Sequence, residues 1–439
     1  MKSQVFKWSA VAFLLSVAII CAHFYNALNT KSEYPDTDET LGVQTPISPQ
    51  PQTPRTEFPK LPLLSPVSDG FLQNFGGTGE DFVLYSLVLG DDIFVFGHTF
   101  SSDYDFLSHG LFVCRLSNLG VVEKVLEFEN ATFLSSNLTE NGIILAFNTQ
   151  NSTKIVFLSA ELEETHSFII PKLSTKCTFL LSPEYVFFLA ENVGGISIFR
   201  LSLDGKEQIS LSYSLDYFAG TVGFSYVFDR LIFLANQNTA LSFYVFDKNL
   251  ELISKKSFSY PHTICAQSAI PAFLNQDVGF AITAKCGENI LFLGLTQSGI
   301  TAFSRTLIKA DESYLLRTES GDYLAFCKKE KDSSATLLCS HGDIIEQNVL
   351  SLSGYFPKDF LYQSGSTILL LFDEKEKSGA IASLNSQNTL SFSYSFKDVE
   401  PVSLSFSQNG LLLSLNATAS STYFGSCYGK TDGFLLNLN

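Results

Sequence analysis

The chain has 439 residues, of which 45% are hydrophobic and only 16% are charged, so it can bury a large core and is not a disordered polyelectrolyte. Its 28 Lys and Arg residues against 44 Asp and Glu residues give a net charge of −16, which repels phosphate backbones and argues against nucleic-acid binding. Its aromatic residues, 41 Phe and 17 Tyr against one Trp, favour β-strands.

Residues 1–28 are predicted to form an uncleaved signal anchor. Lys2 and Lys7 precede an apolar run at 8–22. The aromatic residues that follow this run extend it to the length of a spanning helix. Basic residues on this side of the run place the rest of the chain outside the cytoplasm. We therefore expect a single-pass protein of the cell membrane that contacts the bilayer through residues 8–25.

The anchor has three alternatives: a cleaved secretory signal, a lipid anchor and a buried core helix. A cleaved secretory signal needs a small-x-small site, and Ala27 is a weak candidate because Tyr25 lies two residues before it. A lipid anchor at Cys21 would normally follow Gly or Ala, whereas this chain has Ile20.

The segment 29–69 is predicted to be an extended stalk. Proline at this density cannot complete helices or sheets, and the intervening residues are largely Thr, Ser, Gln and acids. The prolines are Pro35, Pro46, Pro49, Pro51, Pro54, Pro59, Pro62 and Pro66. A proline-motif docking site is the alternative function for this segment.

From residue 70 onward the chain repeats one pattern, in which an apolar strand ends in a switch to polar residues. The pattern occurs eight times, at 93–98, 143–148, 185–192, 231–238, 279–285, 323–329, 368–374 and 411–417. Each unit opens with a strand such as 81–90, and each switch is followed by a second apolar strand such as 196–205. In seven units a more alternating strand then follows, such as 206–214. Four strands of graded burial every ~40–50 residues are typical of a propeller blade.

Residues 70–439 are therefore predicted to form a single all-β domain, a β-propeller of eight four-stranded blades. The eighth unit stops at Asn439 after its third strand, and we expect the segment 70–77 to supply the missing outer strand and close the ring. Seven blades would follow if the fainter units at 260–308 or 356–396 are wrongly divided. A tandem of two-sheet sandwiches is the rival fold, but it does not explain so regular a period.

Two segments, 74–120 and 423–439, resemble the bacterial β-propeller repeat of secreted and surface proteins. That repeat has a Gly-Gly-x-Gly start, a strand ending in Gly-x-Thr, and Asp-Gly/Ala-Phe before an apolar strand. The turn residues on this pattern are Gly76, Gly77, Gly79, Gly97, Gly110, Asp432 and Gly433. The resemblance implies a binding or scaffold module, and the repeat has no agreed catalytic residues. We expect the first three glycines to adopt positive φ.

The sequence contains no nucleophile elbow, metalloprotease, phosphate-loop or dinucleotide motif, so we predict no catalytic residues and no cofactor. Asp103 and Asp105, in a polar loop between His98 and His109, are weak candidates for calcium ligands. The alternative is an ordinary loop whose Asp and Ser side chains cap turns.

Cys327 and Cys339 flank a predicted hairpin centred near Ser333. Symmetrical pairing of its strands would place the two thiols opposite each other, and a disulfide would then form in an oxidising compartment. The alternative is that both are buried as free thiols.

Three functions are compatible with these features. The first is a membrane-anchored, extracytoplasmic propeller that binds a protein or a glycan, or acts as a scaffold, without catalysis. The second is a carbohydrate-active or other hydrolytic propeller with two or three carboxylates at the mouth of a central tunnel, beside tyrosines. The third is a structural surface protein that packs laterally through an exposed apolar patch.

Overall fold

The computed structural model describes residues 70–439 except 102–108, 204–206, 216–217, 386–388, 419–430 and the positions 238, 261, 319, 331, 353, 364 and 439. The predicted anchor and stalk lie outside the described residues. Every secondary-structure element identified in the described part is a β-strand. That part contains no helix long and apolar enough to cross a membrane.

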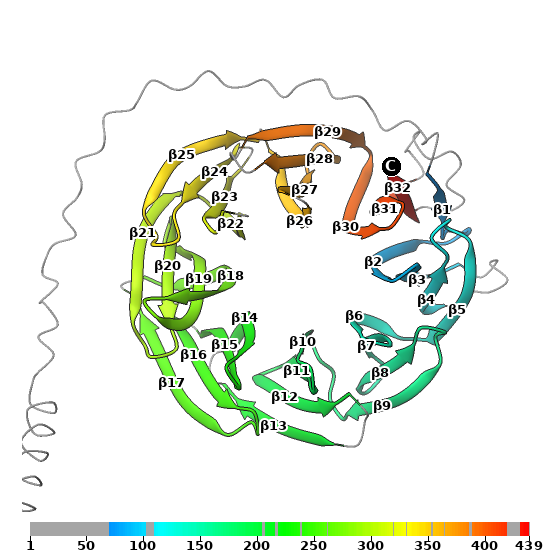
Figure 1. The fold of residues 1–439 in the computed structure, drawn as a ribbon, viewed down its shortest axis with the longest axis horizontal. Coiled ribbons are helices and arrows are strands. Elements are labelled where there is room, and N and C mark those ends of the chain that lie inside the picture. The colour runs from blue at the N-terminus through cyan, green and yellow to red at the C-terminus, as the bar shows by residue number, and fades with distance from the viewer. Residues whose placement is uncertain are drawn as a thin grey trace, which may run out of the picture. The chain divides into compact units, whose positions relative to one another are not determined.

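The strands form eight antiparallel sheets of four strands each, arranged as blades around one axis (Figure 1). Blade 1 contains β2 (Asp81–Leu89), β3 (Asp92–Thr99), β4 (Gly110–Leu116) and β5 (Val122–Glu129). Blade 2 contains β6 (Thr132–Thr139), β7 (Gly142–Asn148), β8 (Thr153–Ser159) and β9 (Glu164–Ile170). Blade 3 contains β10 (Lys176–Leu181), β11 (Tyr185–Asn192), β12 (Gly195–Ser202) and β13 (Gln208–Ser214). Blade 4 contains β14 (Phe218–Val227), β15 (Arg230–Gln237), β16 (Ala240–Asp247) and β17 (Leu252–Ser259).

The second half of the ring repeats this order. Blade 5 contains β18 (Ile264–Leu274), β19 (Asp277–Cys286), β20 (Asn289–Thr296) and β21 (Thr301–Lys309). Blade 6 contains β22 (Glu312–Arg317), β23 (Tyr323–Lys329), β24 (Asp332–Leu338) and β25 (Ile344–Ser351). Blade 7 contains β26 (Phe356–Gln363), β27 (Ser366–Asp373), β28 (Ser378–Asn385) and β29 (Leu390–Lys397). Blade 8 contains β30 (Val399–Ser407), β31 (Gly410–Thr418), β32 (Thr431–Leu438) and, from the other end of the domain, β1 (Leu72–Asn74).

The prediction of eight blades closed by the start of the domain is confirmed. β1 pairs with β32 in antiparallel register, with Leu72 opposite Leu436 and Asn74 opposite Phe434 (Figure 1). Each blade presents its first strand to the axis, and its fourth strand lies at the periphery. The tandem of sandwiches is therefore wrong.

Burial follows the gradient that the sequence predicted. All eight residues of β12, a third strand, are buried, because neighbouring blades cover both of its faces. In β13, the outer strand beside it, exposed residues alternate with half-buried ones. The core is thus divided into clusters between adjacent blades, and each blade depends on its neighbours.

In most blades, the polar residue that ends the apolar second strand connects its blade to the next one. Asn236 at the end of β15 is bonded twice to Ala266 of blade 5: its Oδ1 accepts from the N–H at 2.8 Å, and its Nδ2 donates to the carbonyl at 2.9 Å. Asn416 makes the same pair of bonds to Val83 across the ring closure, at 2.8 and 3.1 Å. We call these interactions inter-blade clamps.

Four further blades, 1, 2, 3 and 5, make this connection with other side chains or with a single bond. His98, Asn148 and Glu191 accept backbone N–H groups of the following blades at 3.1, 3.2 and 3.0 Å. Lys285 pairs with Asp311 at 3.0 Å. Asp373 is different, because its Oδ1 caps its own turn by accepting from the N–H of Lys375.

Candidate functional site

The residues that carry the repeat resemblance gather where the ring closes. The Asp81 carboxylate is fully buried and accepts from the Gly77 N–H at 2.7 Å and from the Ser101 hydroxyl. Asp432 is equally buried, and the Asn74 amide donates to it at 3.3 Å. With both carboxylates buried and hydrogen-bonded, this cluster stabilises the closure and presents no open site.

The glycines of this cluster are required by close approach. The expectation of positive φ at Gly76, Gly77 and Gly79 is wrong, because none of them has it. A Cβ on Gly76 would lie 2.1 Å from the Cγ of Asp432, and one on Gly79 would lie 2.6 Å from the Phe100 backbone. No side chain fits at these distances, so glycine allows the two ends of the domain to meet.

The remaining motif glycines have related roles. A Cβ on Gly97 would lie 2.2 Å from the Phe112 ring, and one on Gly433 would lie 2.5 Å from the Val83 nitrogen. Gly110 combines a close contact with a φ of 146°. All three therefore serve packing within blade 1 or between blades 8 and 1.

Two other predicted sites have different outcomes. Asp103 and Asp105 lie outside the described residues, so their proposed role with calcium is an expectation only. The prediction of a disulfide between Cys327 and Cys339 is wrong, because Cys327 lies opposite Ser334 and both thiols are free. The ladder places Leu338 opposite Tyr323, so the two cysteines are separated by about five strand residues, or roughly 16 Å.

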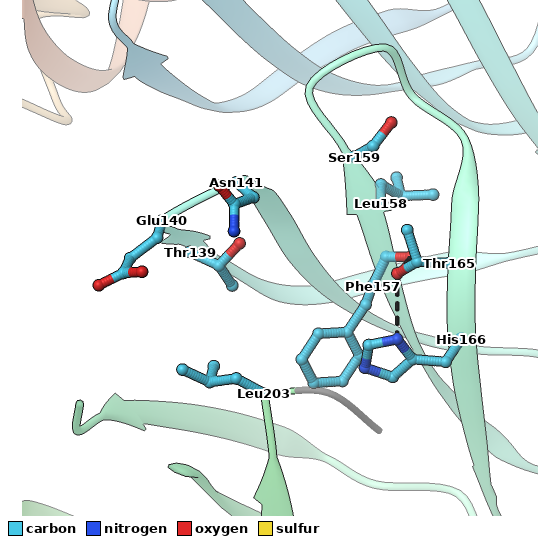
Figure 2. A pocket seen from close by; sticks show the side chains of 9 residues that line it. All are labelled: Thr139, Glu140, Asn141, Phe157, Leu158, Ser159, Thr165, His166 and Leu203. Carbon is cyan, nitrogen blue, oxygen red and sulfur yellow. Dashed lines mark hydrogen bonds between the residues drawn. The ribbon is translucent and has the colours of Figure 1, made fainter. Parts of the chain in front are cut away.

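A pocket of about 440 Å³ lies at the boundary between blades 2 and 3 (Figure 2). Its lining comes from the β6–β7 turn, the end of β8, the start of β9 and the residue that follows β12. The lining residues are Thr139, Glu140, Asn141, Phe157, Leu158, Ser159, Thr165, His166 and Leu203. Antiparallel pairing brings these segments to one edge of the ring, where first-to-second and third-to-fourth strand turns lie; we call this edge the turn face.

One side of the pocket is formed by two stacked rings. Phe157 and His166 lie 4.0 Å apart between centroids and are inclined by 23°. The Thr165 hydroxyl lies 3.1 Å from the Phe157 carbonyl, to which it donates, and its oxygen is hydrogen-bonded to Nδ1 of His166 at 3.0 Å (Figure 2). These bonds hold the imidazole ring in place.

The opposite side is polar and lies on the β6–β7 turn. Glu140 and Asn141 are exposed, and Thr139 is half-buried beside them. Figure 2 shows these three side chains across the pocket from Phe157 and Thr165. Glu140 is the one carboxylate among the described lining residues, and neither Lys nor Arg is among them. Residues 204–206, which follow Leu203, lie outside the described part of the chain.

A half-buried acid, Asp359, lies elsewhere, on the first strand of blade 7. The Asp359 carboxylate accepts from the N–H groups of Phe360 at 2.8 Å and of Leu404 at 2.7 Å, and so connects blades 7 and 8. Burial raises its pKa. Burial, and then the charge of Asp359, raise the pKa values of Tyr85 and Tyr314.

This acid stands beside tyrosines, as the hydrolytic alternative predicts. That alternative also requires a second carboxylate, and in the described part of the chain no other acid contributes to the pKa shift of Asp359. Within the same residues, no three His, Cys, Asp or Glu side chains gather as metal ligands.

Comparisons with known proteins support the fold. No protein-family model matches the sequence, and no curated protein matches it. Among solved structures, the chain is similar to the Dos1 propeller, with 12% identity and a TM-score of 0.51 over 83% of this chain and 94% of that one. It also matches a prolyl endopeptidase structure at 10% identity with a TM-score of 0.44, over 78% of this chain and 54% of that one. At these identities the likeness to the first shows a β-propeller fold alone, and the second carries no argument.

Proposed function

We propose that this chain is a membrane-anchored β-propeller that acts outside the cytoplasm as a non-catalytic binding or scaffold module. The observation that carries the proposal is the pocket between blades 2 and 3. Its polar side chains Glu140 and Asn141 project from a two-residue turn, and its stacked rings are fixed by hydrogen bonds within the blade. A pocket with convergent polar groups and a fixed wall is a common form of small-ligand site.

Exposed apolar side chains on the turn face support the same role. Phe228, in the β14–β15 turn, and Phe273, near the end of β18, are 76% and 65% exposed. Leu119 and Ile300, in third-to-fourth strand turns, are 70% and 54% exposed. These side chains add nothing to the core, and a partner bound across the turn face would cover them.

The conformation of the β14–β15 turn adds to this argument. Phe228 and Asp229 both have positive φ, at 50° and 58°. A bulky residue such as Phe is rare in this region of conformational space, and Gly or Asn would relieve the strain. Retaining a strained, exposed Phe at the tip of a turn is consistent with a surface selected for binding.

The sequence supports the location of this module. The basic residues before the apolar run at 8–22 favour an extracytoplasmic propeller, and the proline-rich segment 29–69 suits a spacer that holds it away from the membrane. The likeness of blades 1 and 8 to the bacterial surface-protein repeat agrees with such a location.

The location is tested by adding a protease to intact cells that express the full chain. We expect the propeller to be reached from outside, whereas a cytoplasmic propeller would be cut only after permeabilisation. Binding is tested by photo-cross-linking on the same cells, comparing the native chain with a Glu140→Gln, Asn141→Ala variant. Cross-links that the variant loses support a binding role for the pocket, and a propeller that forms no cross-links at all contradicts it.

A further inference from the structure

We infer that β13, the outer strand of blade 3, is an interface at which two copies of this chain pair edge to edge. β13 lies on the rim of the ring, and its outward edge has no neighbouring strand in the described part of the chain (Figure 1). Such an edge presents unpaired backbone N–H and C=O groups, which pair readily with another strand. The inference is independent of the pocket and of the membrane location on which the proposed function rests.

β13 carries no charged side chain, although most outer strands of this ring do. Charged side chains on an edge hinder its pairing with another strand. At least one Glu, Lys or Arg lies in each of β5, β9, β17, β21 and β25, and β29 ends in Lys397. β13 has seven uncharged residues, Gln208–Ser214. The described charge nearest to it in the sequence, Glu207, is paired with Arg200 of the same blade at 3.5 Å.

β13 also has a regular backbone. It pairs with β12 residue by residue, from Ser214 opposite Gly195 to Gln208 opposite Leu201, without a register shift. A register shift against the third strand of the blade occurs in each of β5, β9, β17, β21, β25 and β29. A bulge of this kind bends an edge and interrupts its row of backbone groups. Among the outer strands that the structure describes, only β13 is longer than three residues, uncharged and regular.

The sequence of β13 is complementary to a second copy of itself. Two antiparallel copies related by a two-fold axis at Leu211, the middle residue, place Ile209 opposite Tyr213 of the second copy. The same register places Ser210 opposite Ser212 of the second copy. Side chains alternate between the faces of a strand, so apolar groups meet on one face and hydroxyls on the other. The apolar face of β13 is half-buried against the core cluster between blades 3 and 4, and pairing would extend this surface across the junction.

Two charged outer strands show the contrast. Paired in the same way about its midpoint, β17 would place Lys255 opposite Lys256 of the second copy. β21 would place Arg305 opposite the same residue of the second copy. Like charges directly opposite each other on paired strands are destabilising. The observations therefore favour β13 as the strand at which two copies pair, and two rings that touch at one blade diverge on either side of the contact.

The test uses the full chain in detergent micelles and sedimentation velocity from about 1 µM to about 300 µM. We expect a monomer–dimer equilibrium with a Kd on the order of 100 µM, because one strand pair buries less area than a standard interface. Ser210→Lys combined with Ser212→Lys should raise this Kd about 10-fold or more. Both positions are exposed, and in the two-fold register they lie opposite each other.

A charge-reversed chain provides the second measurement. A chain with Ser210→Glu and Ser212→Glu should also fail to dimerise by itself. Mixed with the Ser210→Lys, Ser212→Lys chain, it places opposite charges across the junction, and the mixture should form a dimer with a Kd within about threefold of the native value. Recovery in the mixture also shows that both variants retain their fold.

The control is Ser257→Lys combined with Ser259→Lys, at two exposed positions of β17. Ser257 contacts Ser242 of the third strand through their hydroxyls at 3.0 Å, as Ser212 contacts Ser197 at 3.2 Å. The control thus adds the same charge and alters the same kind of contact on another outer strand. It should change the Kd by less than about twofold.

Three results would overturn the inference. A native chain that stays monomeric throughout shows that β13 does not pair with itself. A dimer that the β13 substitutions leave unchanged, or that the β17 substitutions weaken equally, forms elsewhere. A monomeric chain whose cell-surface cross-links are lost with Ser210→Lys and Ser212→Lys binds a different protein at this edge. The proposed function is tested separately, because it predicts cross-links that depend on Glu140 and Asn141.

Discussion

At the scale of the residue, His98 shows how one position can make the stability of a large ring depend on pH. Its Nε2 accepts a hydrogen bond from the N–H of Phe133 in blade 2, so this nitrogen must be unprotonated in the clamp. Burial lowers the pKa of the imidazole below its usual value of 6.5. Asn148, Asn236 and Asn416 occupy the equivalent positions in other blades and do not titrate.

His98→Asn should therefore reduce the pH dependence of folding. Because the folded pKa is lowered, the unfolded chain binds protons more readily, and the stability present above pH 6.5 is lost as the pH falls through the folded pKa. Denaturant unfolding of the native chain from pH 7.5 to 5 should include this loss, of about 1 kcal/mol, and the variant should lack it. His262→Asn, at an exposed position, is the control. Parallel pH profiles for the native chain and His98→Asn would contradict the role of His98.

At the scale of the element, the blade is a unit that cannot complete its own hydrogen bonds. Several first strands contain a β-bulge, such as that between Ala266 and Ser268 in β18. The clamp from the preceding blade bonds the backbone at or next to this irregularity, as Asn236 does at Ala266. The polar switch at the end of the second strand thus supplies a neighbour with bonds that the ladder within the blade leaves unmade.

Asn236→Ala should lower the free energy of unfolding by about 1–3 kcal/mol, because the N–H and the carbonyl of Ala266 both lose their partner at a buried position. Asn151→Ala, in the exposed β7–β8 turn, is the control and should change the stability by less than about 0.5 kcal/mol. Thermal or denaturant unfolding measures both. Equal effects of the two substitutions would show that the clamp contributes nothing.

At the scale of the whole molecule, the ring is held closed by one short strand and a buried polar cluster. β1 has three residues, and it covers the edge of β32, where Leu435 and Leu436 are almost fully buried. The side chains of Asn74 and Asp432, 358 positions apart in the sequence, meet at this junction. Closure removes the free sheet edge that an open arc of blades would present.

A chain that begins at residue 77 should lose this protection, whereas one that begins at residue 70 retains β1. We expect the shorter chain to unfold at a lower temperature and to self-associate through the exposed edge of β32. Light scattering after size exclusion and a thermal melt measure the two properties. A shorter chain that stays monomeric with an unchanged melting temperature would show that β1 is dispensable.

The repeating order of strands could be predicted from the sequence, because a strand that is buried on both faces is a nearly continuous run of apolar residues. The runs at 143–148 and 185–192 are apolar up to their polar last residues, and the outer strand at 206–214 alternates. The number of blades and the closing role of residues 70–77 followed from counting these runs. The register of the hairpin at Cys327 did not, because its turn directly follows Lys329 instead of lying near Ser333. This displacement shifts every pair and leaves no mark in the composition.

What only the tertiary structure decided is the chemistry between blades. The sequence determined that a polar residue ends each second strand, but not that Asn236 reaches Ala266, since that contact depends on the position of the neighbouring blade. The pocket could not be predicted for the same reason, since its lining includes Glu140 and His166 of one blade and Leu203 of the next. Periodicity reports how deeply a strand is buried, whereas a site depends on which side chains converge from different blades, and that convergence is fixed only when the ring closes.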